Sequence, residues 1–338
     1  MNITRIGVDL AKNVFQVHGV NRQGEIVVKK QLRRTQMLDW FGKLAPCLIG
    51  MEACGSAHYW ARELGKCGHD VRLMAPQFVK PYVKRGKNDA NDAEAICEAV
   101  SRPSMRFVAV KTVAQQTLQA EHRIRARLVR SRTALSNEIR GLLAEFGVIV
   151  PTSLGALRRA LPEILEDSDN GLIGDFRVLL SELAEELRSL DDRVKFYDAR
   201  LQARARTDER IGRLLAVEGI GPVVASALVA AVDDGKQFGK GRDLAAWLGL
   251  TPREHSSGGK QHLGGISKQG DTYVRTLLIH GARAALNAAA NKTDPRSRWV
   301  TALAERRNKN IATVALANKN ARIAWAILAK GEAYRAAA

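Results

Sequence analysis

Four acidic side chains lie in segments where a chemical role explains them better than solubility does. Asp9 interrupts an apolar run near the start of the chain, and Glu52 ends a second apolar run. Asp89 and Asp92 are three residues apart at the head of a helical stretch, so they share one face of that helix. A carboxylate in an apolar strand is costly unless a cation or a hydrogen-bonding group compensates it. Because carboxylate oxygens are the ligands of hard ions such as Mg²⁺, these residues predict a metal site for phosphodiester chemistry.

The elements that must position these acids alternate between strand and helix over residues 1–110. The expected strands are two within 3–20, then 25–32, 48–52 and 71–74, and the expected helices are 37–44 and 57–68. Three strands followed by alternating helices and strands are typical of a mixed sheet with helices packed on it. A strand acid, an acid at the end of a neighbouring strand and two acids of a following helix can converge at one edge of such a sheet.

The charge of the chain indicates the chemistry of its partners. The 338 residues carry a formal net charge of +18, and the sequence pI is about 10.1. Hydrophobic residues make up 46% and charged residues 26% of the chain, which is ordinary for a globular protein. A positive excess of this size favours nucleic acid, a polyanion, as the partner over a basic surface that serves only solubility.

The sequence favours the reducing cytoplasm and no membrane. We expect no signal sequence, because the start of the chain is a strand with polar flanks. The longest mainly apolar run, 223–232, is shorter than the ~18 residues that a membrane span needs. The cysteines Cys47, Cys54, Cys67 and Cys97 lack the close paired spacing of zinc or disulfide motifs, so they are expected to be buried thiols.

Only helical signals remain between about residues 113 and 205. Five arginines lie close together in the first half of this region: Arg123, Arg125, Arg127, Arg130 and Arg132. Arg123, Arg127 and Arg130 follow helical spacing on one face, while apolar residues form a separate stripe. Because only one acid lies near them, the arginines favour a phosphate-binding face over an ordinary solvated face.

The second half of the helical region contains a heptad seam. Its apolar residues recur at alternating spacings of four and three: Phe176, Leu180, Leu183, Leu187, Leu190, Val194, Tyr197 and Leu201. An antiparallel hairpin with the earlier helix would explain the seam, and so would a coiled coil between subunits; the two can coexist. Residues 147–174, which contain two prolines, are expected to be a break between the two halves.

Two glycine-containing segments characterise the C-terminal part. Residues 217–225 resemble the turn of a helix-hairpin-helix element, in which Gly219 and Gly221 would let backbone N–H groups approach a phosphate. Residues 251–271 are a long polar, glycine-rich loop, and a loop of this length is typically functional or disordered. Amphipathic helices are expected at 273–290 and 311–328.

These pieces in this order resemble the DEDD transposases of bacterial insertion sequences, family one-ten and more narrowly its eleven-eleven group. The acidic positions match as Asp9 in Gly-Val-Asp-Leu-Ala-Lys, Glu52 in Gly-Met-Glu-Ala, and Asp89 and Asp92 in Lys-Asn-Asp-Ala-Asn-Asp-Ala. The C-terminal match runs from Gly219-Ile-Gly-Pro through Gly249-Leu-Thr-Pro-Arg-Glu and Ser257-Gly-Gly-Lys to Ile266-Ser-Lys-Gln-Gly-Asp. The resemblance covers nearly the whole chain, and the ordered set of motifs is highly specific.

The resemblance implies three domains. Residues 1–110 would form a RuvC-like, ribonuclease-H-type catalytic domain, 111–205 a helical coiled-coil linker, and 206–338 a mostly α-helical transposase domain. The four acids would bind Mg²⁺, and the family's Ser-Gly pattern places a nucleophile on Ser257, with Ser256 as the alternative. A guide RNA encoded beside the gene would pair with donor and target DNA. The protein would then be bacterial, cytoplasmic and associated with the nucleoid.

Further expectations concern contacts, assembly and rival functions. The phosphate contacts expected beside the acids and the serine are Lys87, Arg253, Lys260 and Lys268. Because exchanging strands of two duplexes needs several active sites, we expect a homodimer that pairs into a tetramer. A hydrolytic junction nuclease with the same carboxylates and a non-catalytic nucleic-acid scaffold are the rival functions. In the simplest alternatives Asp89 only caps a helix and Ser257 is only a turn residue.

Overall fold

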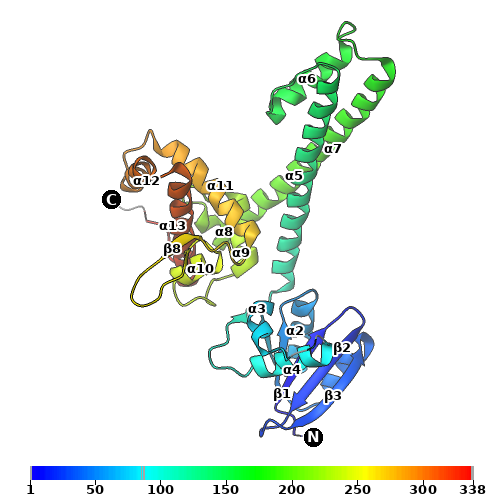
Figure 1. Cartoon of the computed structure of the whole chain (residues 1–338), viewed down its shortest axis with the longest axis vertical. Coiled ribbons are helices and arrows are strands. Elements are labelled where there is room, and N and C mark those ends of the chain that lie inside the picture. The colour runs from blue at the N-terminus through cyan, green and yellow to red at the C-terminus, as the bar shows by residue number, and fades with distance from the viewer. Residues whose placement is uncertain (1, 85, 87, 336–338) are drawn as a thin grey trace. The chain divides into compact units, whose positions relative to one another are not determined.

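The computed structural model describes residues 2–84, 86 and 88–335, and the chain divides into two compact units at Val113/Ala114 (Figure 1). Unit 1 is built on a six-stranded sheet and unit 2 mostly on helices. The predicted mixed α/β architecture with a largely helical C-terminal part is therefore confirmed. The further domain boundary expected near residue 205 stays a prediction. No described helix has both the length and the apolar character that crossing a membrane requires.

Unit 1 contains a mixed sheet with helices on both faces. The strands are β1 (Arg5–Leu10), β2 (Val14–Val20), β3 (Ile26–Arg33), β4 (Leu48–Glu52), β5 (Asp70–Met74) and β6 (Phe107–Val108). Their order is β3-β2-β1-β4-β5-β6; β1, β4 and β5 are parallel, and the other neighbours pair antiparallel. The helical segments are η1 (Arg34–Gln36), α1 (Met37–Gly42), α2 (Ala57–Lys66), α3 (Pro76–Val79), η2 (Lys80–Tyr82) and α4 (Asp89–Ala99). This is the arrangement expected of a RuvC-like domain.

Successive side chains of β1 point alternately to the two faces of the sheet, and the two faces pack against different helices. Ile6 and Val8 are fully buried in a core that includes Trp60 and Leu64 of α2. The intervening residue Gly7 faces α4 on the opposite side, as alternation along a strand requires. Asp9, two residues after Gly7, therefore emerges on the face that α4 covers.

Two glycines allow α4 to pack directly on the strands. Gly7 of β1 is the register partner of Gly50 of β4. A Cβ atom on Gly7 would overlap the carbonyl oxygen of Ala93, and one on Gly50 would lie 2.8 Å from the Cβ atom of Val100. Side chains at these two positions would push the helix away, so the glycines set the distance between the helix and the acidic ends of β1 and β4.

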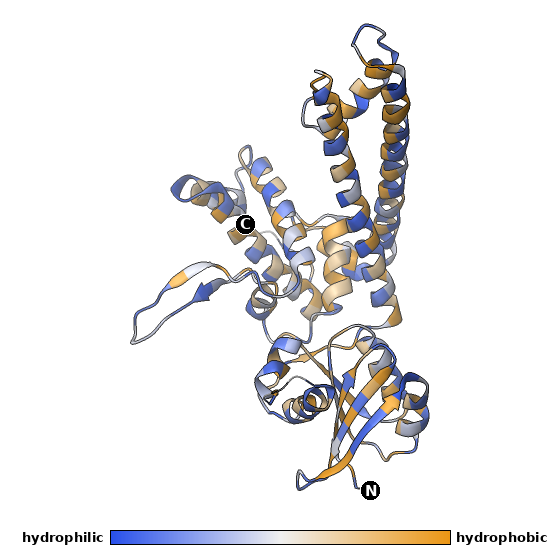
Figure 2. Cartoon of the chain, turned by 45° about the vertical axis from the view of Figure 1, so that its right-hand side comes forward, coloured by the Kyte–Doolittle hydropathy of each residue, from blue (hydrophilic) through white to orange (hydrophobic). Residues whose placement is uncertain are grey.

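Unit 2 contains two long helices and a compact helical bundle. The helices are α5 (Val113–Glu145), α6 (Leu154–Glu166), α7 (Gly174–Thr207), α8 (Glu209–Leu214), α9 (Pro222–Val232), α10 (Gly241–Trp247), α11 (Thr272–Ala289), α12 (Pro295–Arg306) and α13 (Lys309–Lys330). Strands β7 (Pro252–Glu254) and β8 (Leu263–Ile266) form an antiparallel hairpin. Helix α9 is apolar on almost every side and lies in the core of the bundle (Figure 2).

The heptad seam of α7 packs within the chain. Helices α5 and α7 run antiparallel, and Leu180, Leu187 and Val194 join a core with residues of α5 and α6. Ion pairs fix the register at successive levels, Arg132 with Asp191 at 3.1 Å and Arg125 with Asp198 at 2.5 Å. The hairpin interpretation is thus the one observed in the chain, and the coiled coil between subunits stays a prediction.

Three segments differ from the sequence-based expectation. The expected break at 147–174 contains helix α6, which accommodates Pro162 within it. The expected loop at 251–271 contains the β7–β8 hairpin, which projects from the helices of unit 2 in both views (Figure 1, Figure 2). Helix α12 was not expected; its N-cap is Asp294, whose carboxylate accepts hydrogen bonds from two backbone N–H groups of the first turn.

Candidate active site

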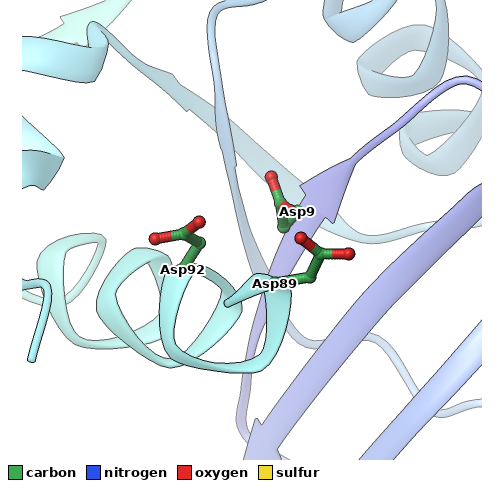
Figure 3. A group of neighbouring side chains, drawn as sticks. All are labelled: Asp9, Asp89 and Asp92. Carbon is green, nitrogen blue, oxygen red and sulfur yellow. The ribbon is translucent and has the colours of Figure 1, made fainter. Parts of the chain in front are cut away.

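Three of the four predicted acids converge in unit 1. Asp9 lies near the end of β1, and Asp89 and Asp92 lie in the first turn of α4. Each offers a carboxylate oxygen, and these oxygens all lie within 4.8 Å of one another (Figure 3). Asp9 and Asp92 are half-buried, whereas Asp89 is exposed. Residues some 80 positions apart in the sequence are thus combined into one anionic site.

Neither aspartate in the first turn of α4 is needed to cap the helix. The cap is Asn88, whose side chain accepts a hydrogen bond from the backbone N–H of Asn91 at 2.8 Å. Asp89 and Asp92 therefore do not carry out the capping role that the simplest alternative gave to Asp89. Because they are three residues apart on a helix, both side chains project toward the end of β1 (Figure 3).

Glu52 lies beside this cluster rather than within its 4.8 Å group. It ends β4, two residues beyond Gly50, as Asp9 lies two residues beyond Gly7, so both acids emerge on the α4 face of adjacent parallel strands. Burial raises the pKa of Glu52, and the negative charges of Asp9 and Asp92 raise it further. Glu52 thus shares the electrostatic environment of the cluster.

The negative charges of the clustered acids repel one another, and no basic side chain is among the groups that shift the pKa of Asp9. Burial raises the pKa of Asp9, and the charges of Asp92 and Asp89 raise it further, against one backbone hydrogen bond that lowers it. Like charges at this distance disfavour ionisation unless a cation lies between them. A set of hard oxygen donors that repel one another is the donor chemistry that Mg²⁺ or a similar divalent ion requires, so the residues fit a metal site.

The predicted serine lies on the exposed β7–β8 hairpin of unit 2. The carbonyl oxygen of Ser257 accepts a hydrogen bond from the backbone N–H of Lys260 at 3.0 Å, which closes the turn. The hydroxyl of Ser256 donates to the Glu254 carboxylate at 2.7 Å and accepts from the backbone N–H of His262 at 3.2 Å. Among the described residues, the Ser257 hydroxyl has no such partner, so it is free to meet a substrate.

The base of this hairpin is held tightly. A Cβ atom on Gly270 would overlap the carbonyl oxygen of Trp247, so the two chain segments approach at backbone distance. The buried guanidinium of Arg275 donates to the carbonyl oxygens of Leu248 at 2.9 Å and Gln269 at 2.7 Å. One side chain thereby links the chain segments that enter and leave the hairpin.

The predicted phosphate contacts fall into two groups of exposed cations. Arg123, Arg127 and Arg130 are exposed on α5, and none of them forms an ion pair with a described residue. Their neighbours Arg125 and Arg132, by contrast, are paired with acids of α7. The phosphate contacts expected near the serine are also exposed: Arg253, Lys260 and Lys268. Lys87 lies outside the described residues.

The predicted helix-hairpin-helix turn lies between α8 and α9, and its two glycines differ. Gly219 has a left-handed φ of 84°, and a Cβ atom there would lie 2.7 Å from the carbonyl oxygen of Gly281 in α11. Gly221, the N-cap of α9, has open space around its α-carbon. The carbonyl oxygen of Glu218 accepts a hydrogen bond from Arg296 at 2.9 Å, which fixes the turn. Gly219 thus has a packing role, and a phosphate-binding role for either glycine stays a prediction.

Reasoning from the sequence missed Arg275 and the glycine pair Gly7 and Gly50. An arginine four residues after the helix-capping Asp271 is a weak signal, because most arginines in a first turn face solvent. The glycine pair could have been noticed, since each glycine lies two residues before a predicted acid in an apolar run. Glycine within a strand often marks the close approach of another backbone.

Comparison with known proteins agrees with this geometry. Residues 6–147 match the profile of a DEDD transposase family of the IS110 type, described as "Transposase". Residues 212–298 match the "Transposase IS116/IS110/IS902 family". A probable family 20 transposase of Pseudomonas aeruginosa is 59% identical over 99% of both chains.

More distant relatives carry insertion-sequence names. The transposase for insertion sequence element IS1111A of Coxiella burnetii is 47% identical over 100% of this chain and 93% of its own length. The transposase for IS1328 of Yersinia enterocolitica is 39% identical over 98% of this chain and 99% of its own length. The chain therefore belongs to the IS110/IS1111 family of insertion-sequence transposases and is a DNA transposase.

Proposed function

We propose that this transposase cuts and rejoins DNA strands through the hydroxyl of Ser257, with Mg²⁺ held by Asp9, Glu52, Asp89 and Asp92. The observation that carries the proposal is the convergence of Asp9, Asp89 and Asp92 within 4.8 Å on a sheet of the RuvC-like type. A DEDD-type domain suggests the use of a divalent metal, and the oxygen-only donor set favours Mg²⁺ over softer metals. When bound, Mg²⁺ would stabilise negative charge that develops on the phosphate.

The acids would act by position. Asp9 and Asp92, which are half-buried, would supply fixed ligands, and the exposed Asp89 would complete the open side that faces the substrate. Glu52 would join as a fourth donor from the adjacent strand. Because α4 rests on Gly7 and Gly50, these donors are held in place by backbone packing rather than by flexible side chains alone.

The serine would act as a transient carrier of the DNA end. Attack by the Ser257 Oγ on a backbone phosphorus forms an Oγ–P bond and breaks one P–O bond of the DNA. The serine proton passes to a base, and the departing DNA oxygen takes up a proton as a hydroxyl group. Attack on this phosphoserine by the hydroxyl of another DNA strand restores a phosphodiester and frees the serine. Water would not return the strand to a phosphodiester, so a covalent route suits recombination.

Nucleic-acid binding would extend over both units. The exposed arginines of α5 and the cations of the β7–β8 hairpin lack ion-pair partners among the described residues and are available to phosphates. The net charge of +18 is in keeping with two kinds of nucleic-acid partner, donor and target DNA and an element-encoded guide RNA. Exchange of strands would take place in a tetramer formed by two dimers.

Trapping of a covalent adduct tests the serine. Labelled DNA that carries the end of the element is incubated with the full-length protein and Mg²⁺, together with the RNA encoded beside the gene, and adducts are resolved under denaturing conditions. We expect an adduct with the wild type and with Ser256→Ala, and none with Ser257→Ala. Equal adducts from all three proteins would refute the assignment of Ser257, and cleavage without any adduct would identify a hydrolytic nuclease.

Substitution of the acids tests the metal site separately. Asp9→Ala should abolish cleavage while binding of DNA and RNA persists, because the arginine faces are untouched. EDTA should have the same effect on the wild type. Full cleavage in EDTA would remove the metal from the mechanism, and binding without cleavage under every condition would support a scaffold.

A further inference from the structure

A groove opens beside the acid cluster in unit 1. It has a volume of about 390 Å³ and lies between strands β2 and β3 and the first turn of α4. Its lining residues are Gln16, Lys29, Gln31, Asn88, Asp89, Ala90 and Asn91. Asp89 lines the groove and is also a member of the acid cluster, so the two sites share a wall.

Strand register connects the groove to the acids. Gln16 of β2 pairs with Asp9 of β1 on one side and with Gln31 of β3 on the other. The three residues form a row across neighbouring strands, and residues at paired positions project on the same face of a sheet. The row therefore leads from the acid cluster directly into the groove, beneath the N-terminal turn of α4.

Several polar side chains that line the groove have no hydrogen-bond partner among the described residues. Gln16 is only 7% exposed, yet its side-chain amide makes no hydrogen bond with any described residue. The amide atoms of Gln16 are not fully buried, so they reach the water of the groove and are available to a ligand that displaces this water. Gln31 and Lys29 on the neighbouring edge are exposed and equally unpaired among the described residues. The side-chain oxygen of Asn88, Oδ1, accepts the hydrogen bond that caps α4, and the side-chain NH₂ group of Asn88 remains available to a ligand.

The side chains that line the groove favour a nucleobase over a phosphate as its ligand. Amide side chains each present a donor and an acceptor, as the hydrogen-bonding edge of a base does, and a glutamine or asparagine pairs best with adenine. The carboxylate of Asp89 disfavours an anion within the groove, while Lys29 at its outer edge supplies one contact for a neighbouring phosphate.

We propose that this groove binds the base of the DNA nucleotide next to the phosphate that is cut, with Gln16 and Gln31 as the residues that select it. This inference rests on the proposed cleavage role of the acid cluster. To reach the groove the base must leave its stack, which positions the adjoining phosphate at the acids. An adenine at this position is expected to be cut fastest.

The experiment uses the strand-cleavage assay of the full-length protein with its nucleic-acid partners. Once the cut bond has been mapped, each base on either side of it is varied in turn, and cleavage rates are compared among wild type, Gln16→Leu and Gln31→Leu. We expect an adenine preference of about tenfold at one adjoining position in the wild type, and its loss in both variants. Gln31 is exposed, so its variant tests the groove even if Gln16→Leu fails to fold.

A matched pair of lysines serves as the control. Lys29 and Lys30 are consecutive on β3 and point to opposite faces of the sheet, and only Lys29 lines the groove. Lys29→Ala should lower the cleavage rate, and Lys30→Ala should leave it within twofold of the wild type. In EDTA, DNA with 2-aminopurine at the selected position should become more fluorescent on binding to the wild type but not to Gln31→Leu.

The outcomes separate this inference from the proposed function. Metal-dependent cleavage with an unchanged base preference in Gln16→Leu and Gln31→Leu would overturn the groove and leave the acid site intact. Equal effects of Lys29→Ala and Lys30→Ala, or a preference that follows only the guide RNA sequence, would also overturn it. Absence of cleavage in the wild type would instead refute the proposed function.

Discussion

The acid cluster should destabilise the protein when no metal is bound, and Asp92→Asn should relieve this cost. The acidic oxygens lie at most 4.8 Å apart. Two unit charges at that distance repel by roughly 1 kcal/mol in bulk water and by roughly 3.5 kcal/mol at an effective dielectric constant of about 20. Because Asp9 and Asp92 are half-exposed, solvent screening places the repulsion in the lower part of this range. We expect Asp92→Asn to raise the metal-free stability of unit 1 by about 1–2 kcal/mol, or several degrees in melting temperature.

The destabilisation by the acid cluster should be visible as a loss of stability when the pH rises. The pKa of Asp9 is raised above its ordinary value of 3.8, and that of Glu52 above 4.5, both first by burial and then by neighbouring acids. The folded state therefore holds these protons more tightly than the unfolded state, and stability falls as the pH rises through the raised values. Asp92→Asn should flatten this fall when urea unfolding is followed in EDTA from pH 4 to pH 7.

Addition of Mg²⁺ supplies the complementary measurement. At a concentration one hundred times its dissociation constant, an ion that binds only the folded state stabilises it by about 2.7 kcal/mol. The wild type should gain such stability at pH 7, and Asp92→Asn should gain little.

The control for these measurements is Glu94→Gln. Glu94 lies on the same helix but pairs with Lys84 at 2.5 Å, so this variant should keep the full response to Mg²⁺. The reasoning is refuted if Asp92→Asn lowers the metal-free stability, or if this variant responds to Mg²⁺ as fully as Glu94→Gln does.

Three further predictions concern packing, titration and binding. Gly7→Ala should destabilise unit 1 by at least ~2 kcal/mol in urea unfolding because α4 must move away, whereas Gly42→Ala, with open space around it, should be within about 0.5 kcal/mol of the wild type. Burial, as the largest cause, lowers the pKa of His122 to about 4. The unfolded state therefore binds the proton more readily, and unit 2 should lose roughly 3 kcal/mol of stability as the pH falls from 6.5 to 4. His122→Gln should abolish this loss when unfolding is measured as a function of pH. Arg127→Ala should weaken nucleic-acid binding and lower the salt slope by about 1 in a titration, whereas Arg132→Ala should chiefly destabilise the α5–α7 hairpin by removing one of the partners of buried Asp191.

Local patterns sufficed to predict the elements that carry the acids. The apolar runs around Asp9 and Glu52 are strands, and the run that begins with Asp89 is a helix, because each pattern is a property of neighbouring residues. The convergence of Asp9 with Asp92 was predicted only as something that such a sheet allows. It depends on strand order and on contact at Gly7 between segments some 80 residues apart, which no local period encodes.

The segments that sequence reasoning got wrong fail for a similar reason. Pro162 suggested a break, but a proline removes one hydrogen bond from a helix, and the apolar face of α6 compensates for this by packing on α5 and α7. The glycine-rich stretch at 251–271 suggested an irregular loop, yet backbone pairing and Arg275 order it as a hairpin. In both cases tertiary contacts override the preference of the local sequence.

The acids and the serine are built in opposite ways, and this difference has a consequence for the proposed reaction. Asp9 and Asp92 are held by the packing of α4 on two glycines, so the proposed metal site would be organised before any substrate binds. Ser257 lies on an exposed hairpin whose base is held by Arg275, so we expect its hydroxyl to be positioned by what the hairpin binds. Metal affinity should therefore be insensitive to DNA, whereas formation of the covalent adduct should require it. Arg275→Met removes the Nη1 group that donates to both carbonyl oxygens, so it should lower the rate of adduct formation and leave Mg²⁺-induced stabilisation of unit 1 unchanged. Loss of both together would show that the hairpin and the acid site do not form independently.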